Sequence, residues 1–174
     1  MLAFNDFTLH NAAMQHAPQQ AHSSAIATIT LDDALIKRRV GEIEHERRVA
    51  MEDLVATADF SVLSGLIAPY QLKISIREGR LSLHITDNAC NEEDILIPLA
   101  PMRGVIKDYF LMCESYYAAI PDAGAERIQT LDMARRSVHN EGAELLTQLL
   151  QGKIALNFTT ARRLFTLICV LHIK

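Results

Sequence analysis

Apolar and polar residues alternate most clearly between residues 72 and 85. The apolar positions of this stretch, spaced two apart on either side of a turn, are Leu72, Ile74, Ile76, Leu81, Leu83 and Ile85. The turn between the two runs is Glu78-Gly79-Arg80. A period of two on both sides of a glycine-containing turn predicts an antiparallel β-hairpin with one apolar face.

Three shorter segments also have strand character. Residues 26–30 alternate and are rich in β-branched side chains, residues 94–99 are bounded by Pro98 and Pro101, and residues 153–158 form a brief strand-like run. Asp32 and Asp33 follow the first of these as a candidate helix cap. Residues 59–69 show no clear period and are expected to form a loop.

Helical periodicity dominates the rest of the chain. Apolar residues at helical spacing predict helices over residues 42–58, 101–120 and 125–150, and Pro121 to Gly124 separates the last two. The third helix is expected to bend near residues 140–142, since Gly142 costs about 1 kcal/mol relative to alanine inside a helix. Such a local break in pattern sometimes marks a functional site.

The last thirty residues, 145–174, contain no aspartate or glutamate but include Lys153, Arg162, Arg163 and Lys174. A helix beginning near Thr159 becomes apolar on nearly every face, which predicts that it is buried. Thr159 or Thr160 is expected to cap its first turn.

Arg162 and Arg163 follow the expected cap of this helix. Free N–H groups, a hydroxyl and two guanidinium groups are suited to hold a phosphate or carboxylate. Pairing of both arginines with Asp108, Glu114 or Asp132 inside the protein is an equally good interpretation, and the sequence leaves the choice open.

Strands that precede helices predict an α+β fold: a small antiparallel sheet with a β-hairpin, packed against a C-terminal helical bundle. One domain is expected over residues 25–174, and the polar, glutamine- and histidine-containing residues 1–24 are expected to form a mobile arm.

Composition argues against several classes of partner and cellular location. The net charge of −4 gives no global positive field, so nucleic acid is a disfavoured partner. Three cysteines without a Cys-x-x-Cys pair, no secretory signal and no long apolar run predict a cytoplasmic protein without a membrane partner. The chain contains no recognisable cofactor or metal motif, so we expect neither. A homo-oligomer is left open.

Two further groups of residues have chemical potential. Residues 103–117 contain three of the four tyrosines; Tyr109 is expected either to face the core or to line a ligand pocket, and Cys113 to be a structural thiol. Arg135 and His139 share a helix face with Asp132, and a histidine beside a carboxylate has the composition of an acid–base site. His139 and Glu114 are therefore the catalytic candidates, although a helix-end hydrogen bond is the more ordinary role for His139.

The chain resembles an uncharacterised protein family of alphaproteobacteria over residues 26–174. The resemblance rests on the runs IEHER at 43–47, KDYFLMCESYY at 107–117, DMARR at 132–136 with HNEG at 139–142, and TARRLFTLIC at 160–169. No activity, cofactor or catalytic residue is assigned to this family. The resemblance implies a small cytoplasmic bacterial protein.

These observations lead to one main hypothesis and two alternatives. The main one is a non-catalytic binding or regulatory protein with a pocket for an anionic small molecule, whose ligand-binding candidates are Arg162, Arg163, Arg135, Thr159, Thr160 and Tyr109. The alternatives are an enzyme that acts on a phosphorylated or carboxylated small molecule and a protein-interaction module. Convergence of the candidate side chains on one cavity would favour the first two over the third.

Overall fold

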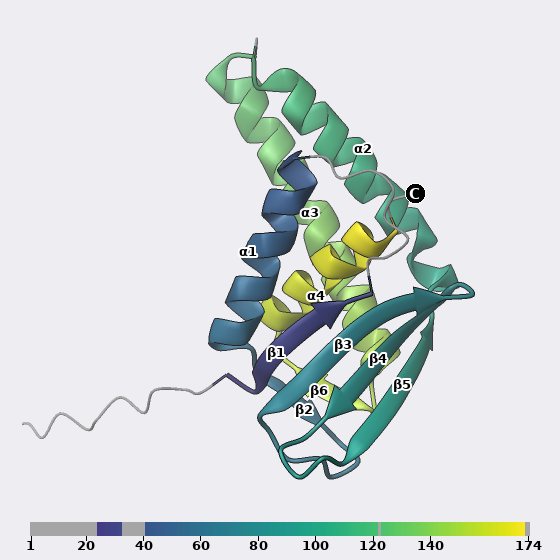
Figure 1. Ribbon diagram of the computed structural model, residues 1–174. Helices are drawn as coiled ribbons and strands as arrows, with labels where there is room; N and C mark the ends of the chain where they lie inside the picture. Colours follow the sequence, from purple (N-terminus) through teal and green to yellow (C-terminus); the bar gives the residue numbers. More distant parts are fainter. Residues whose placement is uncertain (1–23, 33–40, 122, 173–174) are drawn as a thin grey trace, which may run out of the picture.

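The computed structural model describes residues 24–32, 41–121 and 123–172, and shows a sheet with helices packed on one face (Figure 1). The predicted arm therefore lies outside the described residues except for Ser24, and the predicted cap Asp33 also lies outside them. Among the described residues, no helix has the combined length and hydropathy that a bilayer crossing requires.

The elements are β1 (Ile26–Leu31), α1 (Gly41–Thr57), β2 (Phe60–Val62), β3 (Tyr70–Arg77), β4 (Arg80–Thr86), β5 (Glu92–Pro98), a 3₁₀ turn (Ala100–Met102), α2 (Arg103–Ala119), α3 (Ala125–Leu150), β6 (Ile154–Leu156) and α4 (Phe158–Leu171).

The main sheet has the strand order β1-β3-β4-β5. Strands β3 and β4 form the predicted hairpin, with Leu72 opposite Ile85 and Ile74 opposite Leu83. Its two-residue turn consists of Glu78 and Gly79, whose φ angles of 51° and 72° give the pair of positive values that a type I′ turn needs. The hairpin, and the α+β fold class with it, are confirmed.

Strand β1 adds a parallel edge to this sheet. It pairs with β3 in the parallel sense, whereas β3, β4 and β5 are antiparallel to one another. The connection from β1 to β3 passes through α1 and β2, and a crossover of this length is what a parallel pair requires. The sheet is therefore antiparallel in three strands and parallel at one edge.

The sequence predicts a loop over residues 59–69, but part of this segment forms a strand. Residues Phe60–Val62 form β2, which pairs antiparallel with β6 (Ile154–Leu156) in a second, two-stranded sheet. A strand of three residues is too short to show a period, and its partner lies about ninety residues later. No local signal reports such a pairing.

Helix α4 is the central element of the helical layer. It packs against α1, α3 and β3 (Figure 1), and Phe165, Leu167 and Cys169 are each fully buried. Apolar side chains of the sheet, such as Ile74 and Leu83, meet Leu164 there. The prediction that the apolar end of the chain forms a buried helix is confirmed.

Gly142 has a packing role in α3, which is one continuous helix from Ala125 to Leu150. The helix is not interrupted at the point where the sequence predicts a bend. A Cβ atom on Gly142 would lie 2.4 Å from a carbon of the Phe165 ring, far inside van der Waals contact. Glycine is therefore needed because α3 and α4 approach each other closely at this point.

Candidate functional site

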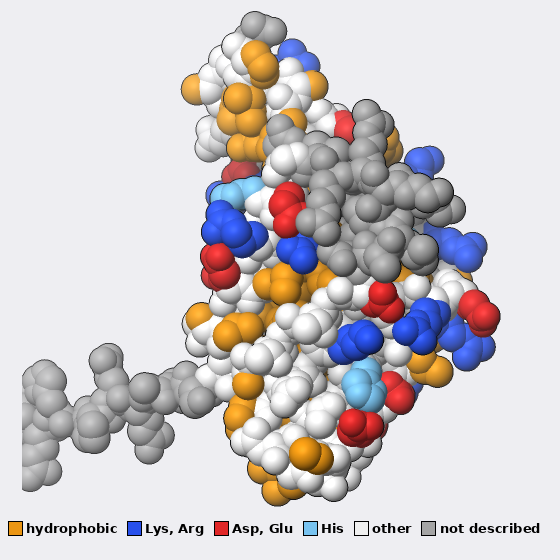
Figure 2. Space-filling view, in the orientation of Figure 1, with side chains coloured by type: hydrophobic (Ala, Val, Ile, Leu, Met, Phe, Trp, Pro, Cys, Tyr) orange, Lys and Arg blue, Asp and Glu red, His pale blue; other side chains and the backbone are white. Residues whose placement is uncertain are grey.

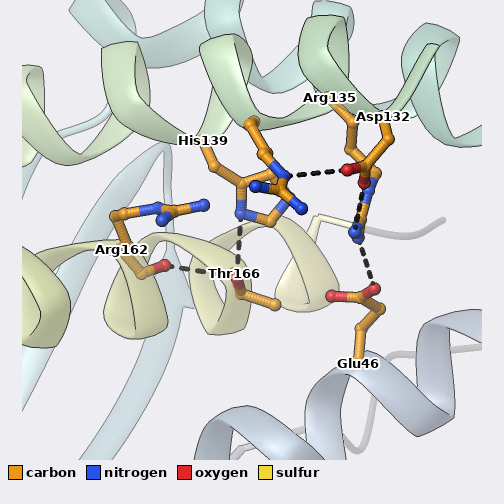
Figure 3. Close-up of polar contacts among 7 residues, drawn as sticks. Glu46, Asp132, Arg135, His139, Arg162 and Thr166 are labelled. Atoms are coloured by element: carbon orange, nitrogen blue, oxygen red, sulfur yellow. Dashed lines mark hydrogen bonds and ion pairs between the residues drawn. The ribbon is translucent and has the colours of Figure 1, made fainter. Parts of the chain in front are cut away.

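Four arginines from α3 and α4 gather where these helices face α1. We call this group, Arg135, Arg136, Arg162 and Arg163, the arginine seam. Figure 2 shows charged side chains of both signs over α1, and Figure 3 shows two members of the seam, Arg135 and Arg162, with Glu46 of α1. The sequence had placed these arginines in two separate groups, and the tertiary structure brings them together.

Arg135 is the most heavily paired member of the seam. Its guanidinium donates to Glu46 of α1 at 2.8 Å and to Asp132 at 3.2 Å (Figure 3). The Arg135 side chain retains 24% exposure and that of Glu46 18%, so the pair is only partly screened by water. Because these carboxylates favour its charged form, the pKa of Arg135 lies above its ordinary value despite the opposing effect of burial. This pair ties α3 directly to α1.

Arg136 and Arg163 are also paired. Arg136 Nε contacts Asp132 at 2.8 Å, and Arg163 forms an ion pair with Asp53 of α1. The internal partner of Arg163 is thus a residue that was not among the three acids proposed from the sequence. Glu46 and Asp53 are seven residues apart, which places them on the same face of α1 two turns apart. This spacing is the sequence signal that could have identified them.

Arg162 differs from its three neighbours. Among the described residues no carboxylate pairs with it, and its buried Nε has no hydrogen-bond partner. Burial lowers its pKa from the ordinary value, and the charges of Arg163, Arg135 and Arg136 lower it further. The seam therefore contains one partly buried cation that is surrounded by like charge and that has no counter-charge among the described residues.

His139 lies beside Arg162 in the interior of the protein (Figure 3). It is 7% exposed and makes edge-to-face contacts with Tyr109 and Phe165, at centroid distances of 5.2 and 6.1 Å. Burial lowers the pKa of His139 to about 4, with further depression from Arg135, Arg162 and Arg163. The imidazole is neutral at physiological pH.

The candidates on α2 differ in their exposure to solvent. Tyr109 is 1% exposed, and burial raises the pKa of its hydroxyl well above the ordinary value; the hydroxyl interacts with the Cys113 thiol. Burial likewise raises the pKa of Cys113 to about 11, which keeps this thiol protonated and unreactive. Glu114 is exposed, and no hydrogen bond or ion pair between described residues joins it to His139.

The cap of α4 is Asn157 rather than Thr159 or Thr160. The helix begins at Phe158, earlier than the sequence indicated, and the Asn157 side chain accepts a hydrogen bond from the Thr160 backbone N–H at 2.8 Å. Thr160 is 2% exposed, and its hydroxyl accepts from the Asp59 backbone N–H at 3.0 Å. Thr159 is exposed. The prediction of a threonine cap is wrong because the sequence placed the helix start too late.

The structure thus unites Arg135, His139, Arg162 and Arg163, with Tyr109 behind the His139 ring. Thr166 is a participant that the sequence analysis missed, since its hydroxyl is 3.5 Å from His139 Nδ1. A threonine inside an apolar helical run is the signal that could have identified it. In chemical terms, the arrangement combines excess positive charge, unfilled hydrogen-bonding capacity and a neutral imidazole.

The chain is similar to a set of bacterial proteins across nearly its whole length. A UPF0262 protein from Novosphingobium aromaticivorans is 49% identical over 158 residues, which cover 86% of this chain and 96% of that protein. A UPF0262 protein from Xanthobacter autotrophicus is 44% identical over 164 residues, which cover 92% of this chain and 99% of that protein. No solved structure matches the chain. Because the model of this family matches residues 23–174, the chain belongs to the uncharacterised protein family UPF0262.

Proposed function

We propose that this protein is a non-catalytic binding or regulatory protein that holds a small anionic ligand at the arginine seam. The ligand presents a phosphate or carboxylate group to Arg162. The observation that carries the proposal is the lack of a counter-charge for Arg162 among the described residues, in a cluster where Arg135, Arg136 and Arg163 are each paired.

An anion at this position would relieve an unfavourable arrangement. Within the described part of the chain, the seam combines four guanidinium groups with the three carboxylates of Glu46, Asp53 and Asp132, so one positive charge is in excess there. Like charges at partly buried positions repel more strongly than they do in water, because the local dielectric is lower. A guanidinium offers a planar set of donors that matches phosphate and carboxylate oxygens. Binding would therefore replace repulsion with charge-assisted hydrogen bonds.

The environment of the candidate catalytic groups favours binding over catalysis. His139 is enclosed by two aromatic rings, and its pKa of about 4 makes it a weak base near neutral pH. Glu114 is exposed, and no hydrogen bond or ion pair between described residues joins it to His139. We also place the protein in the cytoplasm, which the unpaired state of all three cysteines supports.

Thermal unfolding in the presence of anions tests the proposal. The wild-type protein is titrated with inorganic phosphate and with citrate, against sodium chloride at equal ionic strength. At a ligand concentration of 100 Kd the expected stabilisation is about 2.7 kcal/mol, which for a domain of this size raises Tm by roughly 5–10 °C. The shift in Tm should saturate with ligand concentration if the anion binds at a site. A shift caused by general salt screening does not saturate in this way.

Two variants make the result specific. Arg162→Gln should abolish the anion-dependent shift while leaving the unliganded protein as stable as the wild type, because it removes a charge that its neighbours repel. Arg48→Gln is the matched control, since Arg48 is an exposed arginine of α1 paired with Glu52, and it should keep the full shift. The absence of any shift beyond that of chloride, or an equal shift in Arg162→Gln, would refute the proposal.

A further inference from the structure

Three buried polar atoms around the arginine seam lack hydrogen-bond partners within the described part of the chain. They are Nε of Arg135, Nε of Arg162 and Nε2 of His139. Figure 3 shows the His139 ring between the Arg162 and Arg135 side chains, and the charges of both arginines act on it. Buried polar groups are nearly always satisfied, so unpaired atoms on these neighbouring side chains indicate a missing partner.

The hydrogen-bond network determines which kind of group each atom is. Thr166 has one hydroxyl proton, which it donates to the Arg162 backbone carbonyl at 3.2 Å, the shorter of its two contacts. The longer contact, 3.5 Å to His139 Nδ1, is then one in which the threonine oxygen accepts. On this basis we assign the imidazole proton to Nδ1, which leaves Nε2 as a bare acceptor.

The open positions are thus two N–H donors and one acceptor. A fully ionised oxyanion such as sulfate satisfies the donors but presents only lone pairs to Nε2. An oxyanion that retains a hydroxyl, such as hydrogen phosphate, offers acceptor oxygens to a guanidinium N–H and a hydroxyl donor to Nε2. Both ions are tetrahedral and similar in size, so this proton is the main chemical difference between them.

We propose that the seam selects oxyanions of the phosphate type that carry their own hydroxyl proton, and that His139 Nε2 accepts that proton in a hydrogen bond. This inference rests on the proposed anion-binding function and specifies its ligand class. The proton stays on the ligand, since no transfer step is involved. His139 acts as a specificity-determining residue and not as a catalytic one.

The size of the selectivity follows from the cost of an unsatisfied buried acceptor facing a ligand lone pair. Sites built around a hydrogen bond reject ligands that lack the matching group by at least tenfold, which corresponds to about 1.4 kcal/mol. We therefore expect inorganic phosphate to bind at least tenfold more tightly than sulfate at pH 7.

Isothermal titration calorimetry of the full chain with inorganic phosphate and sulfate, at pH 7 and fixed ionic strength, tests this inference. Equal affinity for the two ions would overturn the selectivity while leaving anion binding intact. Binding of neither ion would refute the proposed function and the inference with it. A preference of tenfold or more for phosphate supports both.

Two variants assign the selectivity to the imidazole. His139→Phe removes the acceptor but keeps an aromatic ring between Tyr109 and Phe165, and it should bind phosphate and sulfate alike. Thr166→Val removes the oxygen that keeps the proton on Nδ1, so the proton can move to Nε2 and the preference should again fall. Persistence of the wild-type preference in either folded variant would overturn the role of His139.

Discussion

Acid should destabilise this protein through one buried side chain, His139. In the folded chain the pKa of His139 is about 4, whereas in the unfolded chain it returns to its ordinary value of 6.5. Between these two values the unfolded chain binds a proton that the folded chain does not. The stability associated with the neutral imidazole is therefore fully present above pH 6.5 and is lost as the pH falls toward 4.

The magnitude of the effect follows from the two pKa values of His139. Their difference corresponds to about 3 kcal/mol once the penalty is fully developed. Between pH 7.5 and pH 5 the expected loss is about 2 kcal/mol, a substantial part of the roughly 5–15 kcal/mol that stabilises a typical domain. Cys113 and Asp132 do not mimic this effect, since the pKa of Cys113 is about 11 and that of Asp132 lies below its ordinary value.

Urea unfolding followed by circular dichroism measures the effect. Wild type and His139→Gln, which cannot titrate, are compared at pH 7.5 and pH 5 in phosphate-free buffers of equal ionic strength. Other groups contribute almost equally in both proteins, so the difference between their pH dependences isolates His139. The wild type should lose about 2 kcal/mol more than the variant. Equal losses in the two proteins would show that the imidazole is not held neutral by its surroundings.

Two substitutions test the packing and the capping of α4. Gly142→Ala should destabilise by about 1–3 kcal/mol, although alanine is the better helix former, because its Cβ would lie 2.4 Å from the buried Phe165 ring; an increase in the urea midpoint would contradict this account of the glycine. Asn157→Ala should cost about 1 kcal/mol through loss of the hydrogen bond to the Thr160 N–H, whereas Thr159→Ala should change stability by less than about 0.5 kcal/mol. Equal losses of Tm in these last two variants would mean that Asn157 is not the dominant cap.

Several features of the fold were predictable because they depend on residues that are close in the chain. The β3–β4 hairpin follows from a period of two around a short turn, and the burial of α4 follows from apolar residues on nearly every face of that helix. The gathering of positive charge near the start of α4 was also evident from composition. In each case the backbone geometry is local, so a short window of sequence contains the whole signal.

Other features depend on how distant segments are placed. The pairing of β2 with β6, the parallel edge at β1 and the pairing of Arg163 with Asp53 each join residues that no local pattern connects. The role of Gly142 also became clear only when Phe165 was found against it.

The sequence by itself determined that Arg162 and Arg163 would lie near the start of a buried helix. It left open whether they pair internally or face a ligand, because both outcomes use the same residue types. In the tertiary structure Arg163 pairs with Asp53 of α1, whereas among the described residues no carboxylate pairs with Arg162. The physical reason is that the balance of charge at a site depends on distances between elements, which the order of residues alone does not specify.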